Sequence, residues 1–181
     1  MTKYYGIGLG RTGTKSLWEA FQQMGFKSRH YMMSFNLKFI AQYDFINDAP
    51  IPFNFKRLDK EFLDSKFIYT IRDIEPWLKS IEKHITKKNT RFIRKRIKLQ
   101  RIEMYGAYRF ERNTFIDAYK KHDKQIREHF KDRPNDLLIM DICNGDGWEK
   151  LIPFIGKENI INKGFDCSTS LFPRLNKGVK S

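Results

Sequence analysis

The chain has 181 residues, a length that predicts one domain over residues 1–181 with a sizeable buried core. Its 35 Lys and Arg against 21 Asp and Glu give a formal net charge of +14, which indicates an anionic partner or substrate. Two cysteines without CxxC spacing exclude a disulfide framework and a cysteine-based zinc site, and no apolar run reaches the roughly 18 residues of a membrane span. We expect a cytoplasmic protein that does not bind a membrane.

The N-terminal stretch holds the most informative pattern. An apolar run at 4–7 leads into a turn with glycines at positions 8, 10 and 13. Apolar residues then follow at i, i+3, i+4 and i+7, the spacing of one buried helix face: Leu17, Ala20, Phe21 and Met24. This order predicts strand, tight loop and helix. Because the first amides of a helix have no partner within it, the turn flanked by Arg11 and Lys15 predicts a phosphate or sulfate site.

Further elements are predicted up to residue 85. In chain order they are a helix end at Gly25, a strand at 26–31, a helix from about 32 to Asp44, a helix at 58–63, a strand at 66–71 and a helix at 75–85. The strand at 66–71 is the clearest, because β-branched and aromatic residues dominate it. It ends at Arg72, which places this side chain at the same sheet edge as Arg11.

Residues 83–133 are strongly basic, with 17 Lys and Arg against 6 Asp and Glu. They predict a basic helical insert of two helices joined near Gly106, with His84 and His122 at the surface. A strand at 136–142 follows, then a turn in which Asp146 is placed to cap a helix at 148–155. Strands that alternate with helices predict a three-layer α/β/α fold with a mainly parallel sheet.

The glycine loop fits three nucleotide-binding patterns. Residues 8–13 match GxGxxG, but the dinucleotide interpretation is weak because Lys27–His30 supply no carboxylate for a ribose. The triphosphate pattern GxxxxGK[ST] needs a lysine where Thr14 stands, and Lys15 comes one residue later. A magnesium-dependent nucleotide kinase, with Asp73 or Asp141 near the metal, therefore remains an alternative.

The third pattern fits best. Residues 10–17, GRTGTKSL, resemble the 5′-phosphosulfate loop of the sulfotransferases that use 3′-phosphoadenosine 5′-phosphosulfate (PAPS). Arg72 and Ser80 resemble the 3′-phosphate segment of that family, in which an arginine at a strand end is followed eight residues later by a helical serine. The resemblance implies a fold like that of the P-loop nucleotide hydrolases, PAPS as donor, adenosine 3′,5′-bisphosphate (PAP) as product, and no metal.

The resemblance also implies residue roles. Arg11 would stabilise the charge that builds on the bridging oxygen during transfer. The implied donor-binding residues are Gly10, Arg11, Thr12, Gly13, Thr14, Lys15, Ser16, Arg72 and Ser80, with Arg174, Lys177 and Gly178 as a looser C-terminal counterpart. Asp48 and His30 are the two candidates for the general base that takes the acceptor proton, and the Asp-x-Pro context favours Asp48.

The acceptor is a hydroxyl or amine of a small molecule or glycan that the sequence does not identify. The basic segment 83–133 would suit an acidic acceptor. The alternative without a functional role is a pair of solvated helices. The competing class of function is a non-catalytic protein that binds nucleic acid or another polyanion, because Lys and Arg stripes neutralise phosphates. No RNA- or DNA-binding signature supports that alternative, and the pattern predicts no oligomeric state.

Overall fold

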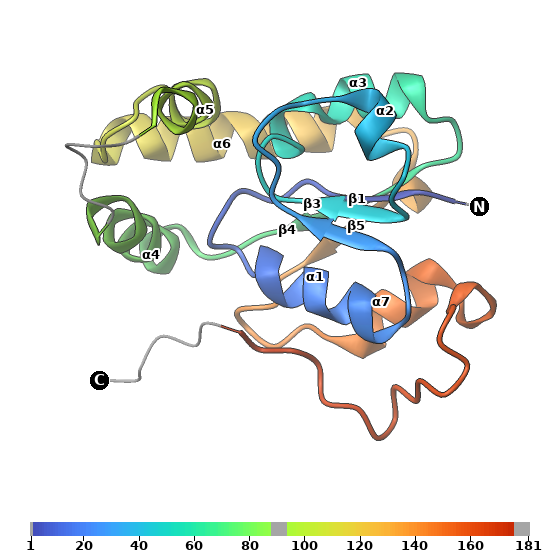
Figure 1. Ribbon diagram of the computed structural model, residues 1–181. Helices are drawn as coiled ribbons and strands as arrows, with labels where there is room; N and C mark the ends of the chain where they lie inside the picture. The colour runs from blue at the N-terminus through green and yellow to red at the C-terminus, as the bar shows by residue number, and fades with distance from the viewer. Residues whose placement is uncertain (1, 88–93, 176–181) are drawn as a thin grey trace.

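The structure is a computed structural model that describes residues 2–87 and 94–175. A parallel five-stranded sheet forms the middle layer, and helices cover both of its faces (Figure 1). The strands in spatial order are β2 (Ser28–His30), β3 (Phe45–Asn47), β1 (Tyr4–Gly6), β4 (Lys66–Thr70) and β5 (Leu137–Met140). The predicted three-layer α/β/α fold with a parallel sheet is confirmed. The one-domain organisation stays a prediction.

The first strand lies at the centre of the sheet. Tyr5 of β1 is in register with Ile46 of β3 on one side and with Phe67 of β4 on the other. Successive strand residues point to opposite faces, so Tyr4 and Tyr5 enter two different apolar clusters. Since every strand runs in the same direction, all the carboxyl ends meet at one edge of the sheet.

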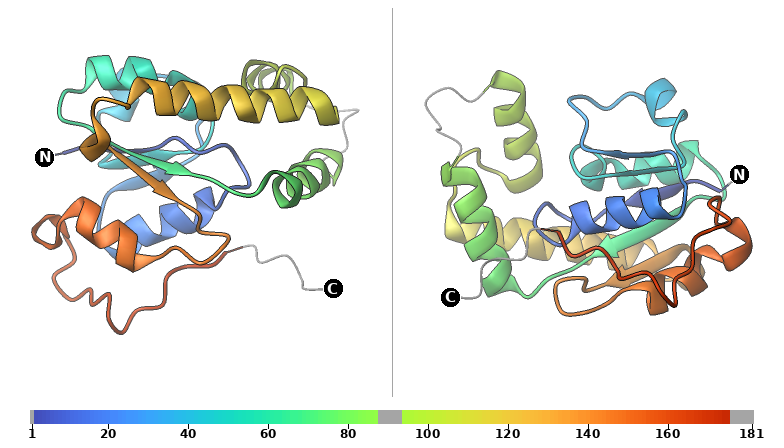
Figure 2. Two further views of the ribbon diagram at one scale, coloured as in Figure 1. Left: turned by 180° about the vertical axis from the view of Figure 1, so that it is seen from behind. Right: turned by 60° about the horizontal axis from the view of Figure 1, so that its bottom comes forward.

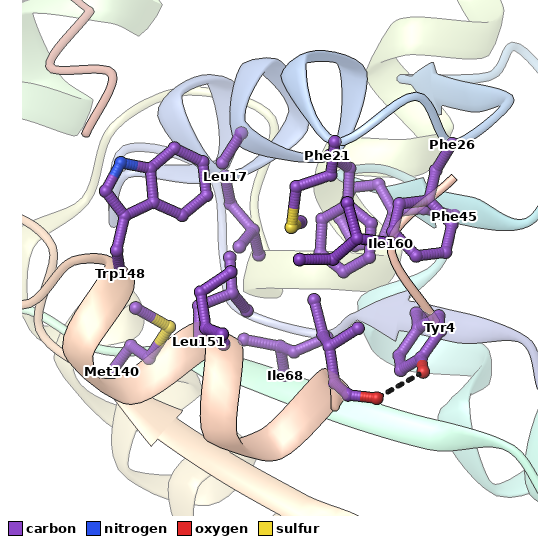
Figure 3. Close-up of a cluster of buried hydrophobic side chains, with 14 of the residues drawn as sticks. Tyr4, Leu17, Phe21, Phe26, Phe45, Ile68, Met140, Trp148, Leu151 and Ile160 are labelled. Atoms are coloured by element: carbon purple, nitrogen blue, oxygen red, sulfur yellow. Dashed lines mark hydrogen bonds between the residues drawn. The ribbon is translucent and has the colours of Figure 1, made fainter. Parts of the chain in front are cut away.

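One face of the sheet is covered by α1 (Thr14–Gln23) and α7 (Trp148–Ile155), as Figure 3 shows. The predicted buried face of α1 is confirmed, because Leu17, Ala20, Phe21 and Met24 are all 0% exposed. Phe21 stacks on Phe45 of β3 with ring centroids 3.8 Å apart. This packing fixes the first turn of α1 at the carboxyl edge of the sheet.

The other face carries α2 (Leu37–Ile40), α3 (Phe55–Glu61) and the C-terminal half of α6 (Arg112–His129). The N-terminal half of α6 extends past the sheet, where it packs with α4 (Ile74–Lys87) and α5 (Lys95–Tyr105), as Figure 2 shows. Three short 3-10 turns complete the regular structure: Pro52–Asn54, Pro134–Asp136 and Lys157–Asn159. Gly106 ends α5 with φ at 81°, so the predicted junction of the two basic helices is confirmed. In the two described stretches, no helix has both the length and the apolar character to cross a bilayer.

Three sequence-based predictions are wrong. The helix expected up to Asp44 is only the four-residue α2, and the strand β3 that follows it was missed, because three residues are too few to show a pattern. Asp146 does not cap α7; its carboxylate accepts hydrogen bonds from the Asp141 amide and from Lys150. His122 is 7% exposed rather than at the surface.

Candidate functional site at the carboxyl edge of the sheet

A cavity of about 1060 Å³ opens at the carboxyl edge of the sheet, where α4 and α5 form its far wall. Segments that follow all five strands reach it. The predicted site residues that line it are Gly10, Arg11, Gly13, Thr14, Lys15, Ser16, His30, Asp48, Arg72 and Arg174. The structure therefore brings together residues that are far apart in sequence, and it brings them to the edge that the strand order predicts.

The loop between β1 and α1 is held in a conformation that the backbone rarely adopts. Arg11 has φ at 76° and Gly13 has φ at 98°, both in the left-handed region. Gly8 is required for close approach, because a Cβ there would lie 2.0 Å from the Thr70 hydroxyl. The Thr12 hydroxyl is 2.6 Å from the Leu9 carbonyl and 2.7 Å from the Thr70 hydroxyl, so this side chain supports the loop, and the donor-binding role of Thr12 stays a prediction.

The first turn of α1 offers backbone donors to the cavity. The first helical hydrogen bond runs from the Leu17 amide to the Gly13 carbonyl at 3.0 Å, so the amides of Thr14, Lys15 and Ser16 precede the helical ladder. No side chain caps this end of α1, and its first turn holds no acidic residue. Together with the positive end of the helix dipole, these amides make a site for an anion such as phosphate or sulfate.

Arg11, Arg72 and Ser80 form a second cluster beside the loop. Nε of Arg11 donates to Oγ of Ser80 at 3.0 Å, and Nη1 of Arg72 donates to the Arg11 carbonyl at 3.2 Å. These bonds use one donor of each guanidinium, so further N–H groups of both remain for a ligand. The sequence pattern predicts that Arg72 and Ser80 lie together; in the structure each of them contacts Arg11.

Helices α4 and α6 fix this loop from behind. Nε1 of Trp77 donates to the Gly10 carbonyl at 3.0 Å, and Nε2 of His122 is 2.8 Å from the Ile7 carbonyl. The Tyr119 hydroxyl donates to the Arg72 carbonyl at 2.7 Å and accepts from the Arg72 amide at 3.1 Å. Part of the basic segment is therefore a support for the phosphate loop rather than a solvated surface.

The two candidate bases lie in contact. Nε2 of His30 is 3.3 Å from Oδ2 of Asp48, and Nδ1 of His30 is 2.9 Å from Oδ1 of Asn47. Because Nδ2 of Asn47 donates to the Thr14 carbonyl at 2.6 Å, the Asn47 oxygen must face His30, and Nδ1 must carry a hydrogen. In neutral His30 the Nε2 atom is then an acceptor that faces a carboxylate oxygen.

Three of the residues around the cavity are strained. Arg11, Tyr31 and Asp48 have φ at 76°, 66° and 64°, and Asp64 on the turn before β4 is the fourth described non-glycine residue of this kind. Left-handed conformations in non-glycine residues cost free energy and tend to gather at functional sites. The sequence pattern did not identify Tyr31 as a residue of the cavity.

The cavity is also lined by residues that were not among the predicted site residues: His84 of α4, Gln100, Arg101 and Tyr105 of α5, and Cys143 in the turn after β5. Burial, aided by the charge of Asp48, holds the pKa of Tyr105 well above its usual range. Burial also raises the pKa of the Cys143 thiol, and Arg72 and Arg11 act against that rise. His84, expected at the surface, is half-buried on this wall.

The described end of the tail crosses the loop. The Leu175 amide donates to Oγ of Ser16 at 2.9 Å, and Nη2 of Arg174 donates to the Gly145 carbonyl at 3.0 Å. Both residues line the cavity. Lys177 and Gly178, the other C-terminal residues predicted to bind the donor, lie outside the described residues.

The two acids that a kinase would place near magnesium lie close to one another. Burial raises the pKa of Asp141, and the charge of Asp73 adds to that rise. The carboxylate of Asp141 already accepts bonds from the Asn144 amide and side chain at 3.0 and 3.2 Å. Within residues 2–87 and 94–175, no three His, Cys, Asp or Glu side chains gather in a metal-binding group.

Comparison with known families gives one match, which begins after the glycine loop and after His30. The family model described as a sulfotransferase domain matches residues 34–180, which include Asp48, Arg72 and Ser80. No curated protein matches the chain. Because the family match covers most of the chain and the fold agrees with it, the protein belongs to the sulfotransferase family.

Proposed function

We propose that the protein transfers the sulfuryl group of PAPS to a hydroxyl or amine of an acceptor. The observation that carries this proposal is the presence of two anion-binding groups in one place. The uncapped amides of Thr14 to Ser16 face the cavity, and the guanidinium of Arg72 lies beside them, tied to the Arg11 carbonyl. PAPS is an adenosine with an anionic group at its 5′ end and another at its 3′ end, so two such groups suit it.

Each group has a distinct part in the proposed reaction. The amides of Thr14 to Ser16 and the Lys15 side chain hold the 5′-phosphosulfate, and Arg72 with Ser80 holds the 3′-phosphate. The acceptor oxygen forms a bond to sulfur while the bond from sulfur to the bridging oxygen breaks, and PAP leaves. Arg11 stabilises the negative charge that grows on the bridging oxygen, a type of electrostatic assistance that reaches about 100- to 1000-fold per donor.

His30 and Asp48 act together as the general base in this proposal. Without an extra proton, Nε2 of His30 and Oδ2 of Asp48 are two acceptors at 3.3 Å, which do not bond. A proton taken from the acceptor hydroxyl turns this contact into an imidazolium–carboxylate ion pair. The pair can hold the transferred proton between the imidazole and the carboxylate, and Asp48 remains the residue to change first.

Calorimetric titration with PAP in the presence of EDTA tests the proposal. We expect PAP to bind without magnesium, and we expect Arg72→Ala to weaken the affinity about 10- to 100-fold because a charge-assisted contact is lost. The matched control is Lys79→Ala, which removes an exposed cation from α4, the helix that follows Arg72, and should leave the affinity unchanged. Binding of ATP that depends on magnesium, without preference for a 3′-phosphate, would support the kinase alternative instead.

A further inference from the structure

Arg101 is a buried cation on the α5 wall of the cavity. It lies on α5 and is 7% exposed, while most arginines in the basic segment are exposed. Burial lowers the pKa of its guanidinium, against the opposing effect of Tyr105 and Tyr31. Burying a charge costs free energy unless an opposite charge pairs with it, so we expect a counter-ion near Arg101.

No carboxylate pairs with Arg101 in the described part of the chain. Its Nη1 donates to the Tyr108 carbonyl at 3.2 Å, which satisfies one of five donors and neutralises no charge. The residues outside the described ones, which are Met1, 88–93 and 176–181, include no Asp or Glu in the sequence. The chain therefore has no acidic side chain left to supply as a counter-ion, and the guanidinium lines the cavity.

Hydrogen bonds of the neighbouring residue hold the backbone at Arg101 beside the segment that follows β2. Its neighbour Gln100 donates to the carbonyls of Met32 and Met33 at 3.1 Å and accepts from the Tyr31 hydroxyl at 3.0 Å. These bonds tie α5 to the segment that follows β2, next to His30. Arg101 thus lies on the side of the proposed base, whereas Arg11, Lys15 and Arg72 lie on the side of the phosphate loop.

The two helices of this wall also supply apolar lining. Ile81 and Ile85 of α4 and Ile97 and Met104 of α5 line the cavity, whose volume of about 1060 Å³ exceeds what a single small ligand needs. Asp48 is the single carboxylate among the described lining residues. An acceptor with an apolar body would cover these side chains, and a negative group on it would meet the guanidinium.

We propose that Arg101 is the anion-binding residue of the acceptor subsite, and that the acceptor is an organic acid with an apolar or aromatic body and a carboxylate or sulfate. This inference rests on the proposed function for the assignment of the cavity's two ends. The acid group forms a charge-assisted bond with Arg101, which directs the hydroxyl or amine of the acceptor toward His30 and Asp48.

Paired probes that differ in one charge test this inference without any measure of turnover. The probes are 4-hydroxyphenylacetate and 4-hydroxyphenylacetamide, with 3-phenylpropionate and its amide as a second pair, titrated calorimetrically into the protein in excess PAP. We expect the wild-type protein to bind each acid about 10- to 100-fold more tightly than its amide. In Arg101→Met this preference should disappear, and in Arg101→Lys part of it should remain.

The matched control is Arg109→Met, which removes an exposed arginine from the same segment and should keep the full preference. Thermal unfolding of each variant shows whether it folds; should Arg101→Met fail to fold, the smaller preference in Arg101→Lys carries the test. Absence of any acid preference in the wild-type protein, or a preference that survives in Arg101→Met, contradicts the inference. PAP binding separates the two proposals: if PAP does not bind, the proposed function fails, whereas an acid preference that depends on Arg101 still supports the subsite.

Discussion

The two walls of the cavity differ in how far each could be predicted from the sequence. The wall at the sheet edge is a local motif, in which the loop, Lys15 and the first turn of α1 lie within a few residues of one another. The helical wall is formed by α4 and α5, which pack against α6, and it belongs largely to the segment that is rich in Lys and Arg. A basic segment can therefore contain a few buried residues that support a site. The sequence alone does not distinguish them, because the exposed residues around them have similar composition.

The largest expected effect concerns the sheet-edge wall. Arg11→Ala should lower kcat for transfer from PAPS about 100- to 1000-fold, because the cation beside the bridging oxygen is removed. PAP release from PAPS, measured with an acceptor found by screening, gives the rate. Loss of PAP affinity with an unchanged kcat would show that Arg11 binds the donor without stabilising the transition state.

The next prediction concerns His30 and Asp48, the two residues proposed to act as the general base. Asp48→Asn and His30→Gln should each lower kcat about 100-fold or more and leave PAP affinity within about twofold. Because the two residues act as one unit, the double variant should lose little beyond the more damaging single change. Asp64→Asn is the matched control, since Asp64 has a similar φ of 60° but does not line the cavity. Additive losses would show that the two residues act separately.

A smaller effect tests whether the helical wall supports the loop. Tyr119→Phe removes the hydroxyl that bonds both backbone groups of Arg72, and PAP affinity should fall about threefold to tenfold in calorimetry. Tyr108→Phe is the control, because its hydroxyl makes no hydrogen bond among the described residues. Equal affinities in the two variants would mean that Arg72 is positioned without help from α6.

The smallest effect concerns acid stability. Burial lowers the pKa of His122, opposed by its hydrogen bond with Ile7 and by Asp123, so the folded state holds the ring neutral. The unfolded chain takes up a proton near pH 6.5, so the contribution of His122 is complete above that pH and is lost as the pH falls toward the folded pKa. Urea unfolding at pH 7.5 and 5.5 should show a smaller acid loss in His122→Gln, which can still donate to Ile7. An unchanged loss would exclude His122 as the acid-sensitive group.

The strand–loop–helix order at residues 4–24 and the position of Arg72 at the end of β4 could be predicted because each depends on spacing within short stretches of sequence. Glycines and backbone amides act locally, and the strand before Arg72 has a clear β-branched pattern. The same reasoning did not predict the contact between the hydroxyls of Thr12 and the buried Thr70, which supports the loop. That partner is 58 residues away in the chain and leaves no local signal.

The rest of the site depends on tertiary contacts. Asn47 fixes the tautomer of His30 only because β3, a three-residue strand, lies between β2 and β1. Arg101 is one of 17 cations between residues 83 and 133, and nothing in its spacing separates it from those at the surface. Burial distinguishes it, and burial is set by how α5 meets the segment after β2.

The central claim is that this edge binds a nucleotide with a phosphate at its 3′ end. It is tested most directly by comparing the affinities of PAP and adenosine 5′-monophosphate, measured by calorimetry in EDTA for the wild-type protein and for Arg72→Ala. We expect the wild-type protein to prefer PAP by about 10-fold or more, and we expect Arg72→Ala to lose that preference. Equal affinity of the wild-type protein for the two nucleotides would contradict the account.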